Sequence, residues 1–418
     1  MTIARPPTNR NATPDFPLAM LADDLTGGCD AGVQFSLRGL ATRVYLDLPR
    51  EPAACAGVSV VVNHCRGDSA EEAVRKVRQA CDWIAASGMK LSYKKIDSTM
   101  KGNVGAELEA IRNRFPDRLI LVCPSFPKMG RILMEGWLKL QSGEAFEPIH
   151  VPSLLATQEA AKLTHISQPA RGAGCEELVK LIWQAEAAGS RIIVIDAVSE
   201  SHLGAIADAA AQIVPQPLLV GSAGLAAAWS ELLLGKRDGE AEAATEKARL
   251  VRPSSRTVAP GPVVLCIGST NTVTTRQLQR LAATQAVSTF DLQRDDPNQA
   301  RAALDKGLHV AVVLPPGSGQ TENLKRFFSA ILHPSHARGL FCSGGDTARL
   351  VCTSLGVRAI QLSNEVLPGL PWGTLAGGVA DGLPICTKAG GFGDTEALCH
   401  AVNFLAAQPR FQVKHSEL

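Results

Sequence analysis

One polar stretch joins a short apolar segment to a helical one: Tyr93-Lys94-Lys95-Ile96-Asp97-Ser98-Thr99-Met100-Lys101-Gly102-Asn103. It places cations, a carboxylate, hydroxyls and a glycine turn within a few residues, and a hydrophobic core needs none of these groups. In open α/β sheets, ligands bind in the crevice outside the carboxyl ends of the strands. The stretch therefore predicts an α/β fold with a binding site at the end of a strand.

Short apolar β-rich segments alternate with amphipathic segments on both sides of this stretch. Such alternation is typical of a mainly parallel sheet whose strands are joined by crossover helices. In the first half we expect strands at Pro17–Leu21, Thr42–Leu46, Val58–Val62, Lys90–Lys94, Arg118–Cys123, Arg191–Ile195 and Leu218–Val220, with helices at Ala31–Gly39, Ala70–Ala86 and Val104–Phe115. In the second half we expect strands at Val263–Ile267, Ala286–Phe290, His309–Leu314, Leu340–Ser343, Ala359–Leu362 and Pro384–Lys388, with helices at Thr272–Ala283, Glu322–Leu332, Thr347–Leu355 and Thr395–Ala406.

The chain is long enough, at 418 residues, to build two α/β domains with real cores. The rhythm of strands and helices breaks at residues 236–261, where a charged run is followed by several prolines and serines. This composition predicts a linker, and a helical extension through 241–248 is the competing interpretation. We therefore predict a flexible tail at 1–15, one domain at 16–235, a linker at 236–261 and a second domain at 262–418. The tail is polar and lacks the apolar core of a signal peptide.

Composition excludes several classes of protein. The net charge is +2 and no basic stripe is interleaved with aromatics, so we expect no nucleic acid partner. No apolar run approaches the ~20 residues of a membrane helix. The 11 cysteines are scattered singly without Cys-x-x-Cys, which argues against zinc and favours a reducing cytoplasm. A homo-oligomer is compatible with the sequence, which does not fix the oligomeric state.

A second polar stretch follows the first expected strand and contains Asp23 and Asp24, followed by Thr26 and Gly27. Adjacent strand residues point to opposite sides, so the two carboxylates are expected to do different jobs. One would face the crevice as a base or ligand anchor, and the other would accept backbone N–H bonds. The alternative is that both cap a helix beginning near Gly28.

In the stretch at residues 93–103 the same alternation places Lys95 and Asp97 on one face. An ammonium group can bind a carboxylate while Asp97 accepts a hydroxyl, which is the chemistry of an acid sugar. The alternative is a surface salt bridge with Ser98 or Thr99 as a helix cap. Arg66 and Arg131 are further cations for a carboxylate, although either alone is more often a solvated arginine.

Three glycine-containing turns follow expected strands in the second half: Gly268-Ser269-Thr270, Ser343-Gly344-Gly345-Asp346-Thr347 and Lys388-Ala389-Gly390-Gly391-Phe392-Gly393. Glycines let the backbone approach a phosphate, and backbone N–H groups at a helix start favour the anion. Three such turns in one half indicate a nucleotide site. The sequence contains no Gly-x-x-x-x-Gly-Lys-[Ser/Thr], and no Gly-x-Gly-x-x-Gly follows the first strand of either half. We therefore expect neither a P-loop enzyme nor a Rossmann dehydrogenase.

Taken in order, these motifs resemble those of the four-carbon acid sugar kinases. The resemblance rests on residues 22–30, 94–103, Gly130-Arg131, 343–347 and 387–393, and it extends from about residue 17 to about 406. It implies an N-terminal domain that binds an acid sugar and a C-terminal domain that binds ATP. It also implies transfer of a phosphoryl group to the terminal hydroxyl of D-threonate, D-erythronate or an oxo-tetronate. Trp137 follows Gly136 where oxo-tetronate kinases tend to have Gly-His, which favours threonate or erythronate.

The motifs and the resemblance together give the candidate site residues. Those for the sugar acid are Asp23, Asp24, Arg66, Lys95, Asp97, Ser98 and Arg131. Those for ATP are Ser269, Ser343, Gly344, Gly345, Asp346, Thr347, Lys388, Gly390 and Gly391. Asp24 and Asp97 are both candidates for the catalytic base, and Asp346 is a candidate ligand for Mg²⁺ bridging the phosphates of ATP.

Two rival hypotheses share this fold. One is a non-catalytic sensor of sugar acids with a nucleotide-regulated domain, and the other is a lyase or another phosphate-transferring enzyme acting on a different substrate. Because one fold hosts many functions, fold alone cannot decide between them.

Overall fold

The computed structural model describes residues 17–50, 57–141, 146–158, 162–167, 175–235, 259–314, 321–332 and 336–409. The predicted tail at 1–15 lies outside the described residues. So do residues 236–258 of the predicted linker, together with the competing helix at 241–248.

The chain divides into two compact units. The first comprises residues 1–19, 52–57 and 68–243, and the second comprises residues 20–51, 58–67 and 244–418. The second unit thus includes two segments from the N-terminal half. The assignment of sugar acid binding to residues 16–235 and of nucleotide binding to 262–418 stays a prediction.

The second unit contains a mixed sheet. Its strands run in the spatial order β13 (Val287–Asp291), β14 (His309–Val313), β12 (Val263–Ile267), β15 (Gly339–Ser343), β18 (Pro384–Lys388), β17 (Pro371–Ala376), β16 (Ala359–Glu365), β2 (Thr42–Tyr45), β3 (Val58–Val62) and β1 (Leu18–Ala22). The first five strands are parallel, β17 is antiparallel to both of its neighbours, and β16 pairs antiparallel with β2. The carboxyl ends of β12, β15 and β18 therefore meet at one edge.

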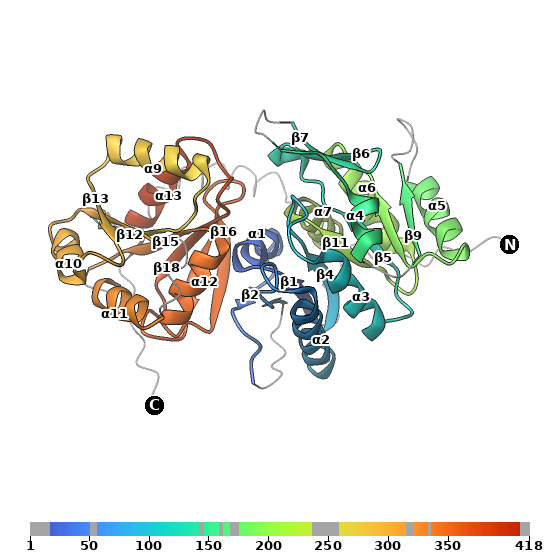
Figure 1. Ribbon diagram of the computed structural model, residues 1–418, viewed down its shortest axis with the longest axis horizontal. Coiled ribbons are helices and arrows are strands. Elements are labelled where there is room, and N and C mark those ends of the chain that lie inside the picture. The colour runs from blue at the N-terminus through green and yellow to red at the C-terminus, as the bar shows by residue number, and fades with distance from the viewer. Residues whose placement is uncertain are drawn as a thin grey trace. The chain divides into compact units, whose positions relative to one another are not determined.

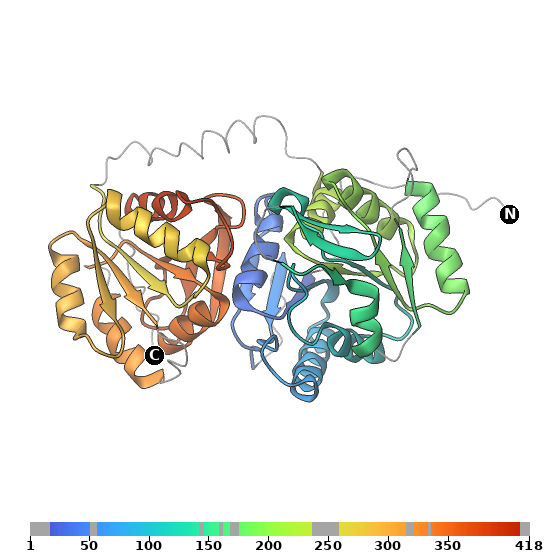
Figure 2. The same ribbon diagram turned by 45° about the horizontal axis from the view of Figure 1, so that its top comes forward.

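Helices cover both faces of this sheet. On one face α9 (Thr272–Thr284) packs against α13 (Ala397–Ala406), and on the other α10 (Pro297–Asp305), α11 (Thr321–Ile331) and α12 (Gly345–Ser354) lie in sequence (Figures 1 and 2). Helix α1 (Leu25–Ser36) packs on α12 and on strands β2, β3 and β16. Strands β12 and β15 are buried along their whole length, as expected for parallel strands covered on both faces.

The first unit is built around a parallel sheet. Its strands run in the order β4 (Lys90–Lys95), β11 (Leu218–Gly221), β5 (Ile120–Cys123), β10 (Ile192–Ile195) and β9 (Leu163–Ile166). Helices α2 (Ala70–Ala86), α3 (Val104–Arg114) and α4 (Val151–Gln158) pack together, as do α5 (Cys175–Ala187), α6 (Glu200–Gln212) and α7 (Ala223–Leu234). A short 3₁₀ helix η1 (Pro127–Met129) precedes a small antiparallel sheet of β6 (Arg131–Met134), β7 (Trp137–Leu140) and β8 (Ile149–His150).

The predicted α/β class with mainly parallel sheets is confirmed. Strands β3, β12 and β18 and helix α2 have the predicted bounds. One helix was predicted to begin at Ala31, and that start is wrong: α1 begins at Leu25, because Asp24 caps it by accepting a hydrogen bond from the Gly27 N–H. No described helix is both long enough and apolar enough to span a membrane.

Candidate functional site

The three glycine-containing turns of the second unit lie side by side. Strands β12, β15 and β18 are neighbours, with Ile267 paired to Ser343 and Ser343 paired to Lys388. The backbone is closely packed here, because a methyl group on Gly390 would clash with the Ser269 Oγ and one on Gly268 with the Thr347 Oγ1. The three turns therefore meet at one edge of the sheet.

Helix α12 begins at this edge without a side-chain cap. Its cap residue Gly344 has φ 105°, a backbone conformation that residues other than glycine rarely adopt. No side chain accepts a hydrogen bond from the first turn at the cap position. A helix start of this kind offers backbone N–H groups and the positive end of the helix dipole to an anion. Asp346 is exposed in the first turn, while Thr347 is buried.

Lys388 lies at the end of β18, and its side chain points into its own loop. The Nζ donates to the carbonyl oxygens of Ala389 (3.0 Å), Gly390 (2.8 Å) and Phe392 (3.2 Å). Burial lowers the pKa of this ammonium group to about 8. The Lys388 ammonium group therefore binds the backbone of the loop that follows β18.

The carboxylates at the end of β1 are held by one arginine. Arg66 donates two hydrogen bonds to Asp23, from Nε to Oδ2 (2.8 Å) and from Nη2 to Oδ1 (2.9 Å). Its Nη2 also lies 2.8 Å from Asp24 Oδ1. Asp23 is completely buried, and such a carboxylate is stable only when it is paired. Both aspartates therefore share Arg66 as a partner, and the two different roles expected for them stay a prediction.

Asp24 links this cluster to the start of α12. Its Oδ1 accepts a hydrogen bond from Gly27 N (2.9 Å) and its Oδ2 accepts one from Thr26 Oγ1 (2.7 Å). A methyl group on Gly345 would clash with Asp24 Oδ2 and lie 3.2 Å from Thr26 Oγ1. The capping alternative is therefore correct for Asp24, which also brings a carboxylate against the candidate phosphate turn.

His64 lies in the turn between β3 and Arg66. Its backbone has φ 50°, an unusual value for a residue other than glycine. Its Nε2 lies 2.7 Å from the Leu46 carbonyl oxygen. Burial and the Arg349 cation lower the pKa of His64. The turn leads directly into Arg66, two residues later.

In the first unit, the end of β4 separates its two lysines as predicted. Lys94 forms an ion pair of 2.6 Å with Glu107 of α3, and both side chains are completely buried. The Lys95 Nζ donates to the Ile96 carbonyl oxygen (2.7 Å). Asp97 is half-buried and its Oδ2 accepts a hydrogen bond from Thr99 Oγ1 (2.8 Å). The alternative with Ser98 or Thr99 as a helix cap is wrong, because Asn103 occupies the cap position of α3.

Ser98 and Arg131 complete the candidates of the first unit, and both are buried. The Arg131 Nη1 donates to the Met129 carbonyl oxygen (2.8 Å), so this arginine is not the solvated residue of the alternative interpretation.

The candidate residues fall into two groups. One group lies in the second unit: Asp23, Asp24, Arg66, Ser269, Ser343, Gly344, Gly345, Asp346, Thr347, Lys388, Gly390 and Gly391. The other group shares the first unit: Lys95, Asp97, Ser98 and Arg131.

Two side chains on α9 were missed by the sequence analysis. Thr274 and Gln277 are completely buried and bond the loop that follows β18. They occupy the same helix face as the buried Leu281. Polar residues on an otherwise apolar stripe were the signal that could have revealed them.

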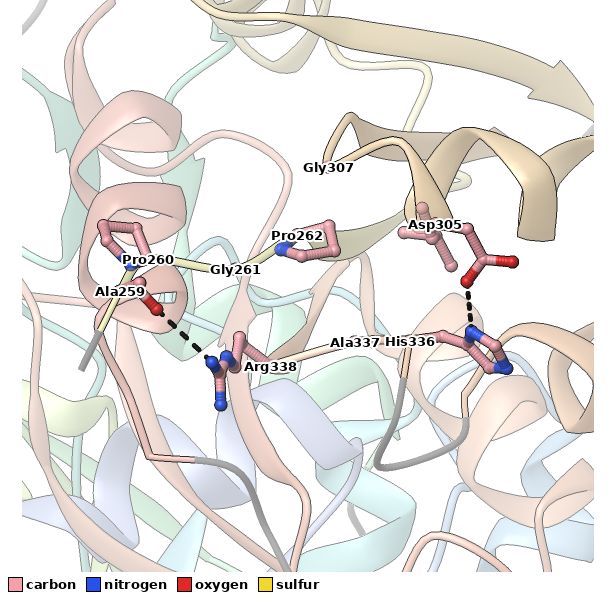
Figure 3. A pocket seen from close by; sticks show the side chains of 10 residues that line it. Ala259, Pro260, Gly261, Pro262, Asp305, Gly307, His336, Ala337 and Arg338 are labelled. Atoms are coloured by element: carbon pink, nitrogen blue, oxygen red, sulfur yellow. Dashed lines mark hydrogen bonds and ion pairs between the residues drawn. The ribbon is translucent and has the colours of Figure 1, made fainter.

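A cavity of about 280 Å³ lies elsewhere in the second unit (Figure 3). Its lining comes from residues just before β12, β14 and β15, at the edge opposite the glycine turns. His336 Nδ1 is paired with Asp305 Oδ1, and Arg338 Nη2 donates to the Ala259 carbonyl oxygen. No candidate residue lines it. The candidate site is therefore the edge that carries the glycine turns.

Two domain-family models match this chain. The model of a sugar-binding N-terminal domain matches residues 18–229. The model of a nucleotide-binding C-terminal domain matches residues 295–398.

Relatives match over most of the chain. A D-threonate kinase of Salmonella typhimurium is 31% identical over 93% of this chain and 98% of that protein. A D-erythronate kinase of Heliobacterium modesticaldum is 27% identical over 93% of this chain and 97% of that protein. The fold is similar to that of a solved Haemophilus influenzae protein, with a TM-score of 0.68 and 20% identity over 93% of this chain and 100% of that one.

Proposed function

This chain belongs to the four-carbon acid sugar kinases, and from that premise we propose that it transfers the γ-phosphoryl group of ATP to the terminal (4-) hydroxyl of D-threonate or D-erythronate. The observation that carries the proposal is the approach of Asp24 to Gly345. Two motifs more than 300 residues apart meet there, one carrying carboxylates and an arginine and the other an uncapped helix start.

The start of α12 and the loop after β18 would bind the phosphates of ATP. The N–H groups at the start of the helix favour an anion, and the glycines at 390 and 391 let a phosphate approach the backbone. Ser269 and Thr347 pack against these turns and fix their shape. Phosphoryl transfer depends mainly on positioning and on charge neutralisation, which suits a site made of backbone amides.

The residues fit a Mg²⁺ ion that is held largely by the nucleotide. Among the described residues, no group of three or more histidine, cysteine, aspartate or glutamate side chains is placed to hold a metal ion. Kinases commonly hold Mg²⁺ with one or two carboxylates and the phosphates themselves. Asp346 is exposed in the first turn of α12 and would supply one carboxylate. The bound ion would neutralise charge on the transferred phosphoryl group.

The end of β4 would bind the sugar acid. The Lys95 ammonium would hold the substrate carboxylate, while Arg66 holds Asp23 and Asp24 in place. The terminal hydroxyl oxygen attacks the γ-phosphorus, the bond to the β-phosphate oxygen breaks, and Asp97 accepts the hydroxyl proton. Asp97 is preferred over Asp24 because both oxygens of Asp24 already accept hydrogen bonds, one of them from a guanidinium.

The alternative acceptor is 3-oxo-tetronate, which the Gly136-Trp137 sequence disfavours. Trp137 is 43% exposed and lies beside His150, with the ring centroids 4.9 Å apart. We also propose a reducing, cytoplasmic location, because every described cysteine is a free thiol and nearly all are buried.

ADP release with a panel of D-threonate, D-erythronate and 3-oxo-tetronate tests the proposal. We expect ADP release with one of the first two acids, and phosphorus NMR should show the new phosphate on the fourth carbon. Binding of both ATP and an acid without ADP release would replace the kinase with a sensor. ADP release with 3-oxo-tetronate alone would correct the substrate.

A further inference from the structure

The loop after β18 turns its carbonyl oxygens toward the protein interior. The Lys388 Nζ donates hydrogen bonds to three of them, the oxygens of Ala389, Gly390 and Phe392. Thr274 Oγ1 donates to the Gly390 oxygen (2.9 Å). Gln277 Nε2 lies within hydrogen-bond distance of the oxygens of Phe392 (3.0 Å), Gly393 (3.2 Å) and Asp394 (2.7 Å). Every residue of 389–394 except Gly391 thus has its carbonyl oxygen engaged by these three side chains.

We propose that Thr274, Gln277 and Lys388 are positioning residues that bind the carbonyl oxygens of this loop and so leave its backbone N–H groups for the phosphates of ATP. The proposal rests on the proposed function and deepens it. A carbonyl oxygen facing a phosphate repels it, whereas an N–H group binds it. Holding the carbonyls on the inner side therefore both orients the donors and removes the repulsion. Among the described residues, the N–H groups of Gly390 and Gly391 donate to no protein acceptor.

The burial of these side chains supports a specific role. Thr274 and Gln277 are three residues apart on α9 and face the same way, and both are completely buried. A buried polar side chain destabilises the fold unless it is hydrogen-bonded, so an apolar residue would serve a purely structural helix face better. Lys388 is a buried cation whose partners are backbone oxygens of the loop and the Thr274 hydroxyl.

The same side chains connect this loop to the glycine-containing turn at residues 343–347. Thr274 Oγ1 lies 3.2 Å from Ser343 Oγ, and Ser343 is two residues before the start of α12. It also accepts a hydrogen bond from Lys388 Nζ (3.3 Å). Thr274 therefore joins the two turns that would bind the phosphates, and removing its hydroxyl should disturb both.

Matched variants of Thr274 test the proposal. Thr274→Val removes the hydroxyl and keeps the shape, whereas Thr274→Ser keeps the hydroxyl. We expect the Kd for ATP, measured by calorimetry on the full chain, to rise about tenfold in Thr274→Val and by less than about threefold in Thr274→Ser. The Kd for D-threonate should stay the same in both, because the side chains that would bind it come from β4.

Gln277→Leu provides a second variant in case Thr274→Val does not fold, and it should raise the Kd for ATP at least about threefold. Wild-type ATP affinity in both variants would overturn the inference. An equal loss of ATP and D-threonate binding with a lower Tm would also overturn it, since that result indicates only a structural role.

Hydrogen exchange of the wild-type protein needs no variant: ATP should slow exchange at Gly390 and Gly391, and unchanged exchange in ATP-bound protein would overturn the inference. A wild-type protein that binds no ATP would instead refute the proposed function.

Discussion

The ends of β1 and β4 carry similar side chains, yet the structure uses them differently. At β1, Arg66 holds Asp23 and Asp24 together, and Asp24 also caps α1. At β4, Lys94 forms a buried ion pair with Glu107. Lys95 donates a hydrogen bond to a backbone oxygen, and Asp97 accepts one from a hydroxyl group. At the first end the charged groups bind one another, whereas at the second end Lys95 and Asp97 bind neutral groups. Similar composition therefore does not imply the same role.

The most demanding test of this comparison is Asp97→Asn. If Asp97 accepts the hydroxyl proton, kcat should fall by about 10²–10⁴-fold. Steady-state ADP release measures this effect, and the Tm should stay close to that of the wild type because Asp97 is only half-buried. Near-normal turnover would remove Asp97 from the role and return Asp24 to it.

Lys94→Met and Lys95→Met form a matched pair on adjacent residues of one strand. Lys94→Met leaves the Glu107 carboxylate buried without its cation, so the free energy of unfolding should fall by about 3–5 kcal/mol. Lys95→Met should change stability far less and should raise the KM for the sugar acid. Urea unfolding and initial rates separate the two outcomes. Equal losses of stability in both variants would contradict the division of labour between the lysines.

Arg66→Met tests the network at the end of β1. The variant leaves Asp23 completely buried without its bidentate partner, and the Arg66 side chain is only 26% exposed. We expect the free energy of unfolding to fall by about 2 kcal/mol relative to the wild type. This difference should be smaller at high salt, because salt screens the ion pairs of Arg66 in the wild type. Unchanged urea unfolding would show that the two aspartates do not depend on this arginine.

Lys388 extends the comparison to a buried cation whose partners are neutral oxygens. Burial lowers its pKa from 10.5 to about 8, and the titratable neighbour acting on it, among the described residues, is the Cys386 thiol of β18. Burial raises the pKa of that thiol well above its usual range, so it stays neutral.

Between pH 8 and 10.5 the folded protein therefore binds fewer protons at Lys388 than the unfolded chain does. Stability from this group consequently rises with pH, by about 1 kcal/mol between pH 7 and pH 9. ATP affinity should move the opposite way, because the deprotonated amine donates fewer hydrogen bonds to the loop. Unfolding and ATP titrations of the wild type and Lys388→Met at both pH values check this. Identical pH dependence in the two proteins would contradict it.

Much of this architecture was predictable from the sequence. The alternation of apolar and amphipathic segments placed the strands that end in the glycine turns, because parallel strands buried on both faces leave a continuous apolar signature. Strand β17 was missed because Pro371 and Gly373 interrupt its pattern. The strands β6, β7 and β8 were missed because they are only partly buried and so lack the signature of a strand covered on both faces.

The candidate site was only partly predictable. Strand alternation separated Lys94 from Lys95, since neighbouring side chains point to opposite faces. It could not reveal that Asp24 meets Gly345, because that contact depends on how α1 packs on α12. Nor could it show that the Lys388 side chain points into its own loop. That arrangement depends on the positions of backbone carbonyl oxygens, which the pattern of residue types does not reveal.

The pairing of β2 with β16 has a consequence for synthesis. Thr42–Tyr45 hydrogen-bonds to Ala359–Leu362, so an early strand waits for a partner translated roughly 300 residues later. At about 5–20 residues per second, the nascent chain would hold β2, β3 and α1 without that neighbour for roughly 15–60 s. For the same reason, a truncated product beginning at residue 262 would expose the edge of β16, a surface prone to aggregation.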